Sequence, residues 1–242
     1  MQATEHQSVE LQKQFWKYWN FKHGYPYDHG IRPRRRGEKI LAYLRSLRLE
    51  RPTILDMGCG TGWFANELAQ FGATTGIDLS DEAIAQAKAK FPQLTFKAGN
   101  LFEMDLPEQH FDVVVSQEVI AHVPDQSGYL DRAARVLKPG AYLILTTPNL
   151  FVHKRNHWDP IPPGHIEQWL SRRALKRLLR PHFHVVRMTT AVPMGHGGIL
   201  RLVNSYRVNW VVGLLFSPTR IEAFKEWAGF GWTRIVLAQK RR

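Results

Sequence analysis

The stretch Ile54-Leu55-Asp56-Met57-Gly58-Cys59-Gly60-Thr61-Gly62 decides the fold of this chain. Two apolar residues lead into an acid, and three glycines then follow at alternate positions. Glycine adopts positive φ angles without a steric penalty, so this spacing allows a tight turn and leaves bare main chain beside a ligand. Ligands of open parallel sheets bind where the strands end. The stretch therefore predicts a strand, a ligand-binding turn and the start of a helix.

Short apolar strands and helices alternate after this stretch. We expect strands at 53–57, 74–78, 94–98, 111–116 and 141–147, and helices at 62–71, 81–90 and 127–137. The strands at 111–116 and 141–147 are apolar nearly throughout, as expected for parallel strands that are covered on both faces. The alternation predicts an α/β fold with a doubly wound, mostly parallel sheet.

We interpret the chain, residues 1–242, as one domain with three parts. Residues 1–52 form an N-terminal helical cap with helices at 8–20 and 36–48, and residues 53–150 form the core that holds the ligand. Residues 151–242 form the other half, with a helix at 171–180 and strands at 183–189 and 231–239. The long insertion at 191–230 is typical of a lid.

A dinucleotide-binding enzyme is the obvious competitor for the glycine turn. Its fingerprint, G-x-G-x-x-G, requires a third glycine at position 63 when it is counted from Gly58, and Trp63 stands there. A pyrophosphate needs open N–H groups at the start of the helix, and a tryptophan obstructs close approach. The stretch therefore favours a ligand without a phosphate.

The next two expected strands also end in residues that suit an adenosine ligand. Asp78 stands where an acid can accept both hydroxyls of a ribose, and Leu79 beside it can pack on an adenine ring. Asn100 and Leu101 follow the third strand, where a polar side chain can meet the adenine amine. Three strand ends thus offer consistent chemistry.

At this point the chain resembles class I S-adenosylmethionine-dependent methyltransferases, in the branch that includes the ubiquinone-biosynthesis O-methyltransferases. The resemblance is carried by Ile54–Gly62, Gly76–Ser80, Phe111–Val114, and Leu137–Gly140 through Thr147-Pro148-Asn149. It implies S-adenosylmethionine as the cofactor, S-adenosylhomocysteine as its product, and a seventh, antiparallel strand that begins at Gly231. The third strand of that family more often ends in Gly-Asp, so Asn100 is a departure.

The resemblance also implies which residues form the cofactor site. They are Asp56, Gly58, Cys59, Gly60, Gly62, Asp78, Leu79, Asn100 and Leu101, with Ser116 and Gln117 after the fourth strand.

The segment after the fourth strand holds the candidates for catalysis. It resembles the Glu-Val-x-Glu-His-Val segment of the family, with Ala121 in place of an acid. His122 is the leading general base, with Glu118 and His165 as further candidates; a purely structural role for His122 is the alternative. The Glu118–His122 spacing could also hold a metal, but no third ligand has convincing spacing, so no metal is predicted.

Charge is distributed unevenly along the chain, which carries a net charge of +12. The middle part, 53–150, is acidic, while both flanks are basic, with one cluster at Arg32, Arg34, Arg35 and Arg36 and another on the helix 171–180. A basic flank suits an anionic membrane, nucleic acid, or simply a solvated surface. The apolar segment 208–216 could enter a membrane interface beside such residues, or pack as a lid.

These observations predict a methyltransferase for a small or lipid-like molecule, acting on oxygen by family resemblance. An RNA methyltransferase and a non-catalytic, cofactor-binding partner subunit are the alternatives. The single cysteine and the polar start of the sequence favour the cytoplasm, with possible contact to a membrane surface. The substrate and the oligomeric state are left open.

Overall fold

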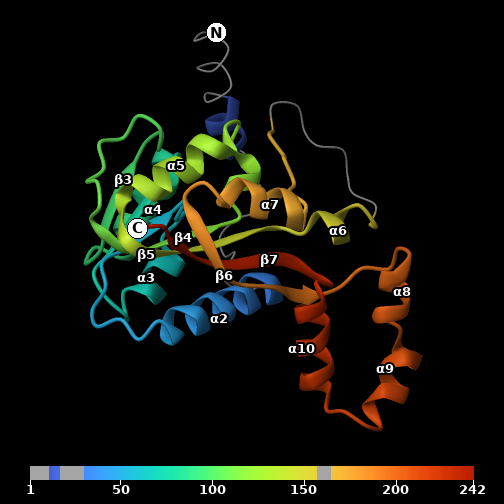
Figure 1. Ribbon diagram of the computed structural model, residues 1–242. Coiled ribbons are helices and arrows are strands. Elements are labelled where there is room, and N and C mark those ends of the chain that lie inside the picture. The colour runs from blue at the N-terminus through green and yellow to red at the C-terminus, as the bar shows by residue number, and fades with distance from the viewer. Residues whose placement is uncertain (1–10, 17–29, 157–164) are drawn as a thin grey trace.

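The computed structural model describes residues 11–16, 30–156 and 165–242, and helices cover both faces of one central sheet (Figure 1). The sheet has seven strands in the order β3-β2-β1-β4-β5-β7-β6. Their bounds are Ile54–Met57 (β1), Thr74–Asp78 (β2), Thr95–Ala98 (β3), Phe111–Gln117 (β4), Leu137–Pro148 (β5), Phe183–Pro193 (β6) and Gly231–Lys240 (β7).

The strand directions confirm the predicted fold class. Strands β1 to β5 pair in parallel, while β7 runs antiparallel to β5 on one side and to β6 on the other. The strand order reverses between β1 and β4, and β1 ends there in the glycine turn. This reversal is the position at which open α/β sheets bind ligands.

Helices connect the strands, and most lie where the sequence predicts them. Their bounds are Ile31–Ser46 (α2), Trp63–Leu68 (α3), Asp81–Lys90 (α4), Ile120–His122 (η2), Gln126–Val136 (α5), Leu150–His153 (α6), Arg172–Leu179 (α7), Ile199–Val203 (α8), Tyr206–Gly213 (α9) and Pro218–Ala228 (α10). The hydroxyls of Ser80 and Ser171 accept from the N–H groups of Ala83 and Ala174, and so cap α4 and α7.

The core consists of two apolar layers, one on each face of the sheet. On one face, Leu55 packs with residues of α5 and α7, such as Leu130 and Leu175. On the other face, Ile54 packs with residues of α2 and α3, such as Ile40. Neighbouring residues of one strand therefore serve opposite layers, as the alternation of side chains along a strand requires.

Three element boundaries differ from the sequence prediction. Helix α2 begins at Ile31 rather than at 36, because Pro33 lies in its first turn, where a missing N–H costs nothing. Strand β5 begins at Leu137, directly after α5, instead of at 141. Strand β6 runs to Pro193, so the insertion spans 194–230 and itself contains α8, α9 and α10.

Part of the predicted cap lies outside the described residues. Of the expected helix at 8–20, residues 11–16 are described and are helical. Among the described residues, no helix combines the length and the apolar character needed to cross a bilayer.

Candidate functional site

The glycine turn after β1 has the backbone that its sequence predicts. Gly58, Gly60 and Gly62 all have positive φ angles. A Cβ on Gly58 would lie 2.2 Å from Cγ2 of Val119, so the segment after β4 packs directly on the turn. A Cβ on Gly60 would meet nothing within 4 Å. The turn is thus closed at Gly58 and open at Gly60, where a ligand can lie against the main chain.

Asp56, at the end of β1, is a buried acid without compensation. It is almost fully buried, and neither carboxylate oxygen has a hydrogen-bond partner among the described residues. Burial, together with the nearby Asp78, raises the pKa of Asp56 to about 7. A buried carboxylate without a partner is costly, so this position suits a ligand that brings a cationic group or N–H donors.

Asp78, at the end of β2, joins the glycine turn to the next helix. Its Oδ2 accepts from the N–H of Gly60 at 2.8 Å, and its Oδ1 accepts from the N–H of Ser80 at 2.9 Å. Burial raises the pKa of Asp78, while these N–H groups oppose the rise. A carboxylate has about four lone-pair sites, so capacity for further hydroxyl donors is left.

Three other predicted cofactor residues are engaged within the protein itself. The amide of Asn100 donates to Glu103 and accepts from the N–H of Phe102, within a local turn after β3. Ser116 is fully buried, and its hydroxyl lies 2.8 Å from that of Tyr129. Cys59 is also buried, and burial raises the pKa of its thiol. Their side chains support the site, while Leu79 and Leu101 are partly exposed beside it.

Arg36 supports the segment after β4, a role that the sequence prediction missed. We expected it in a surface cluster with Arg32, Arg34 and Arg35. Its side chain is instead only 17% exposed; Nε donates to Gln117 at 3.0 Å, and a guanidinium nitrogen lies 3.8 Å from Glu118. Glu118 has a positive φ of 59° and accepts from Thr146, so it is held in place rather than free.

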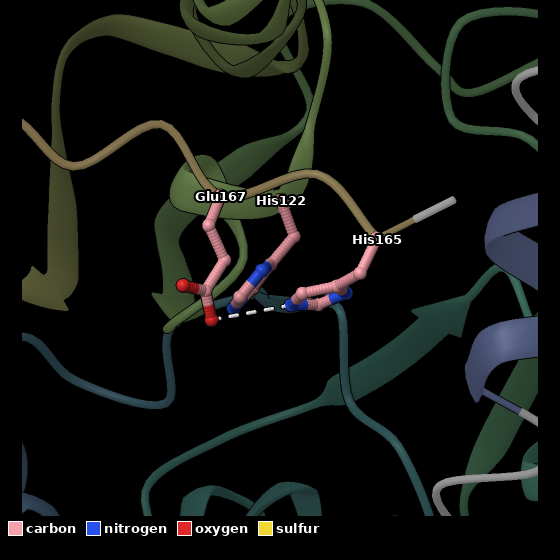
Figure 2. Close-up of side chains that lie close together, drawn as sticks. All are labelled: His122, His165 and Glu167. Atoms are coloured by element: carbon pink, nitrogen blue, oxygen red, sulfur yellow. Dashed lines mark hydrogen bonds and ion pairs between the residues drawn. The ribbon is translucent and has the colours of Figure 1, made fainter. Parts of the chain in front are cut away.

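Helix η2 brings His122 to two residues that are far away in sequence (Figure 2). Nδ1 of His122 lies 3.0 Å from the carbonyl oxygen of Ile166, and Nε2 of His165 lies 3.3 Å from Oε1 of Glu167. One potential ligand atom from each of His122, His165 and Glu167 lies within 4.8 Å of the others. Two predicted catalytic residues thus meet, and Glu167 is a third that the sequence did not single out.

The N-terminal helix covers this cluster with aromatic rings. Phe15 stacks on His165 at 3.8 Å, and Trp16 meets the ring of His122 edge-on at 5.1 Å. Burial lowers the pKa of both histidines, which favours their neutral forms. The predicted cap therefore contacts the predicted catalytic residues.

A cavity of about 410 Å³ lies near the carboxyl end of β5, between α6, α7, β6 and α10. Its wall combines apolar residues such as Phe151 and Trp227 with basic residues such as Lys154 and Arg172. Arg234 lines it, is 4% exposed, and donates to Asn149. The cavity can accept an apolar molecule that carries an acidic or polar group.

The chain matches a protein family described as a methyltransferase domain, over residues 27–182. It therefore belongs to this family, and the fold and the glycine turn are those of its S-adenosylmethionine-dependent, class I members. The prediction of this class is confirmed, and the dinucleotide-binding alternative is set aside.

Curated relatives match about half of their own length. A probable S-adenosylmethionine-dependent methyltransferase of Mycolicibacterium smegmatis is 32% identical over 145 residues, which cover 60% of this chain and 56% of that protein. A ubiquinone biosynthesis O-methyltransferase of a Bradyrhizobium species is 35% identical over 127 residues, 50% of this chain and 48% of that protein.

Solved structures agree on the fold. An S-adenosylmethionine-dependent methyltransferase from Mesorhizobium loti has a TM-score of 0.58 at 20% identity, covering 82% of this chain and 96% of that one. The N-methyltransferase NodS from Bradyrhizobium japonicum, in complex with S-adenosylhomocysteine, has a TM-score of 0.62 at 16% identity, covering 89% and 90%. At these identities the likeness concerns the fold alone.

Proposed function

We propose that this protein transfers a methyl group from S-adenosylmethionine to an oxygen of a small or lipid-like molecule. One observation carries the proposal: a buried, unpartnered carboxylate at Asp56 stands beside a glycine turn that is open at Gly60. S-adenosylmethionine carries an ammonium group and a sulfonium, and both are cations. Its binding would compensate the carboxylate that the free protein leaves unpaired.

The residues of the site fit the parts of this cofactor. Asp56 suits its cationic part, Gly60 offers main chain without a side chain, and Asp78 has acceptor capacity for the ribose hydroxyls. When bound, the cofactor supplies an electrophilic methyl group on sulfur. The protein's own contribution is to bind it, to align the acceptor oxygen, and to exclude water with the helix at 11–16.

The acceptor oxygen has to lose its proton during the reaction. We place this step at His122, because its segment packs on the glycine turn through Val119. Since Nδ1 of His122 faces a carbonyl oxygen, it carries the ring proton, and Nε2 of the neutral ring keeps a lone pair. The oxygen–methyl bond forms as the sulfur–methyl bond breaks, and the electron pair stays on sulfur.

Two observations support a small or lipid-like substrate. The cavity beside Arg234 is largely apolar with a basic wall. The outer surface of α8 to α10 is also apolar and exposed, including Trp210, Leu214 and Leu215. Methylation of oxygen rests on relatives named as ubiquinone biosynthesis O-methyltransferases.

The test is methyl transfer from labelled S-adenosylmethionine to total RNA, to DNA, and to a lipid and small-molecule extract of the source cell. We expect label in the extract, in a product that releases it as a methyl ether or ester. Label mainly in one defined RNA site would replace the substrate class with nucleic acid. Binding of the cofactor without transfer to any of these pools would favour the non-catalytic alternative.

His122→Ala locates the proton-accepting step. Turnover should fall by roughly 10²- to 10⁴-fold, while S-adenosylhomocysteine should bind as before. Unchanged turnover would assign His122 a structural role.

A further inference from the structure

We propose that His122, His165 and Glu167 form a binding site for a divalent transition-metal cation, with Zn²⁺ as the best match (Figure 2). The inference rests on the proposed function only for the role of the cation, because binding itself can be tested without methyl transfer. It changes the role of His122 from a proton acceptor to a metal ligand.

The backbone holds the two ligand-bearing segments together. The N–H of Gln168 donates to the carbonyl oxygen of Ala121 at 2.7 Å. The side chain of Gln126 donates to the carbonyl oxygens of Ile120 and Gln168, at 2.9 and 2.8 Å. The ligands are therefore positioned by an ordered frame rather than by chance proximity of flexible side chains.

The outer contact of His122 is the one that metal-binding histidines use. Its Nδ1–H donates to the carbonyl oxygen of Ile166, which fixes the ring and leaves Nε2 to bind a cation. Such an outer hydrogen bond orients the ring and raises the basicity of the ligand nitrogen. Neutral imidazole is the form that binds metals, and burial lowers the pKa of both histidines.

The distances require only a small closure around the ion. Zinc binds nitrogen and oxygen at about 2.0–2.2 Å, so ligand atoms in a tetrahedral site lie roughly 3.4 Å apart. The three ligand atoms here lie within 4.8 Å of one another, and His165 and Glu167 already lie 3.3 Å apart. Side-chain rotations of this size leave the backbone frame unchanged.

The donor set selects the class of metal. Two imidazole nitrogens and one carboxylate oxygen suit Zn²⁺ and its neighbours in the transition series, whereas Mg²⁺ and Ca²⁺ prefer oxygen ligands only. Three protein ligands leave a fourth position open, as in catalytic zinc sites.

That open position gives the cation a role in the proposed reaction. A substrate hydroxyl bound there would have a lowered pKa and would release its proton to water before methyl transfer. Phe15 and Trp16 cover the cluster, so bulk water would compete less with the substrate for this position.

The experiment is calorimetric titration of the full, tag-free, chelator-treated protein with Zn²⁺, followed by Co²⁺ titration monitored by visible absorption. We expect one ion per chain at micromolar concentration or below, with the absorption of Co²⁺ in a site of low coordination number. His165→Ala should weaken binding by about 100-fold or more, since the loss of even an outer-shell partner costs about 10- to 100-fold.

Glu167→Gln keeps the shape of the side chain and guards against a loss of folding. It should weaken Zn²⁺ binding in the same direction while circular dichroism stays unchanged. His184→Ala is the matched control, because His184 is exposed on β6 and far from the cluster in sequence; it should bind Zn²⁺ like the unmutated chain.

Two results would overturn the proposal: no binding of Zn²⁺ or Co²⁺ by the folded protein, or binding that His184→Ala weakens as much as His165→Ala does. Binding of S-adenosylhomocysteine is measured in the same variants. If this binding is absent while Zn²⁺ binds as expected, the proposed function fails and the metal site stands.

Discussion

Asp56 is stable in the folded protein only at a cost that a ligand can remove. Its carboxylate is buried and has no hydrogen-bond partner among the described residues, and burial raises its pKa to about 7. A folded-state pKa above the unfolded value means that the folded protein holds the proton to higher pH. The stability from this proton is complete below the unfolded pKa of about 3.9 and is lost as the pH rises through about 7.

This sign leads to a prediction for the protein without cofactor. Between pH 6 and pH 8 the ionisation of Asp56 should cost about 1.4 kcal/mol, which is roughly 3–6 °C in Tm for a chain of this size. The Tm of Asp56→Asn minus that of the unmutated chain should therefore grow by this amount between the two pH values. Calorimetric unfolding at both pH values measures it. A difference that does not change with pH would show that Asp56 is not a buried ionisable group.

Asp78→Ala should weaken binding of S-adenosylhomocysteine by about ten- to several hundred-fold. Hydrogen bonds to a charged acceptor contribute roughly 1.5–3 kcal/mol each, and one or two of them would be lost. The variant should also unfold at lower temperature, because Asp78 accepts from Gly60 and Ser80. Asp105→Ala is a suitable control, since Asp105 is an exposed acid. An unchanged dissociation constant in folded Asp78→Ala would remove Asp78 from the site.

Residues that act through local sequence were predictable, and residues that act over long distances were not. Asp56 and Asp78 close strands, so the strand pattern already places them at one edge of the sheet. Glu167 meets His122 only because an irregular segment returns to η2, and no periodicity reports such a meeting. Arg36 looked like one of four surface arginines until α2 placed it beside Gln117.

At the scale of elements, α9 has an unusual surface. None of its residues is buried, and Trp210 is 59% exposed while Leu214 and Leu215, which follow the helix, are 68% and 80% exposed. Figure 1 shows α8, α9 and α10 extending away from the sheet. Helix α7 separates its residues in the ordinary amphipathic way, with Leu175 and Leu179 buried and the basic side chains outside.

We expect this apolar surface to bind anionic lipid vesicles in a salt-dependent manner. Leu214→Ser/Leu215→Ser should weaken binding by about ten-fold or more, because each leucine loses part of the roughly 1.5–3 kcal/mol that burial provides. Val186→Ser is the matched control, since Val186 is half exposed on β6. The measurement is vesicle co-sedimentation at low and high salt. Failure of the unmutated protein to bind vesicles would return the surface to the role of a lid.

The parallel strands and their helices were predictable as elements because each repeats one simple pattern. The strands are buried on both faces, and serines mark the starts of α4 and α7. The three helices within the insertion were not predicted, because their exposed apolar residues lack the one-sided pattern of a core helix. Helix α2 started earlier than expected because Pro33 suggested a loop but is tolerated in a first turn.

At the scale of the whole molecule, charge separates the cofactor site from its surroundings. Residues 53–150 carry 12 acidic and 6 basic side chains, whereas residues 151–242 carry 4 acidic and 16 basic ones. The acidic part contains Asp56 and Asp78 and suits a cationic cofactor. The basic parts surround it and suit an anionic substrate or surface.

The central claim is that the glycine turn and its two acids bind S-adenosylmethionine, and calorimetry tests it most directly. We predict micromolar affinity for S-adenosylmethionine and S-adenosylhomocysteine and no measurable affinity for NAD or NADP, because Trp63 occupies the position of the third dinucleotide glycine. Tight binding of NAD, with no binding of either adenosyl compound to the folded protein, would contradict the account.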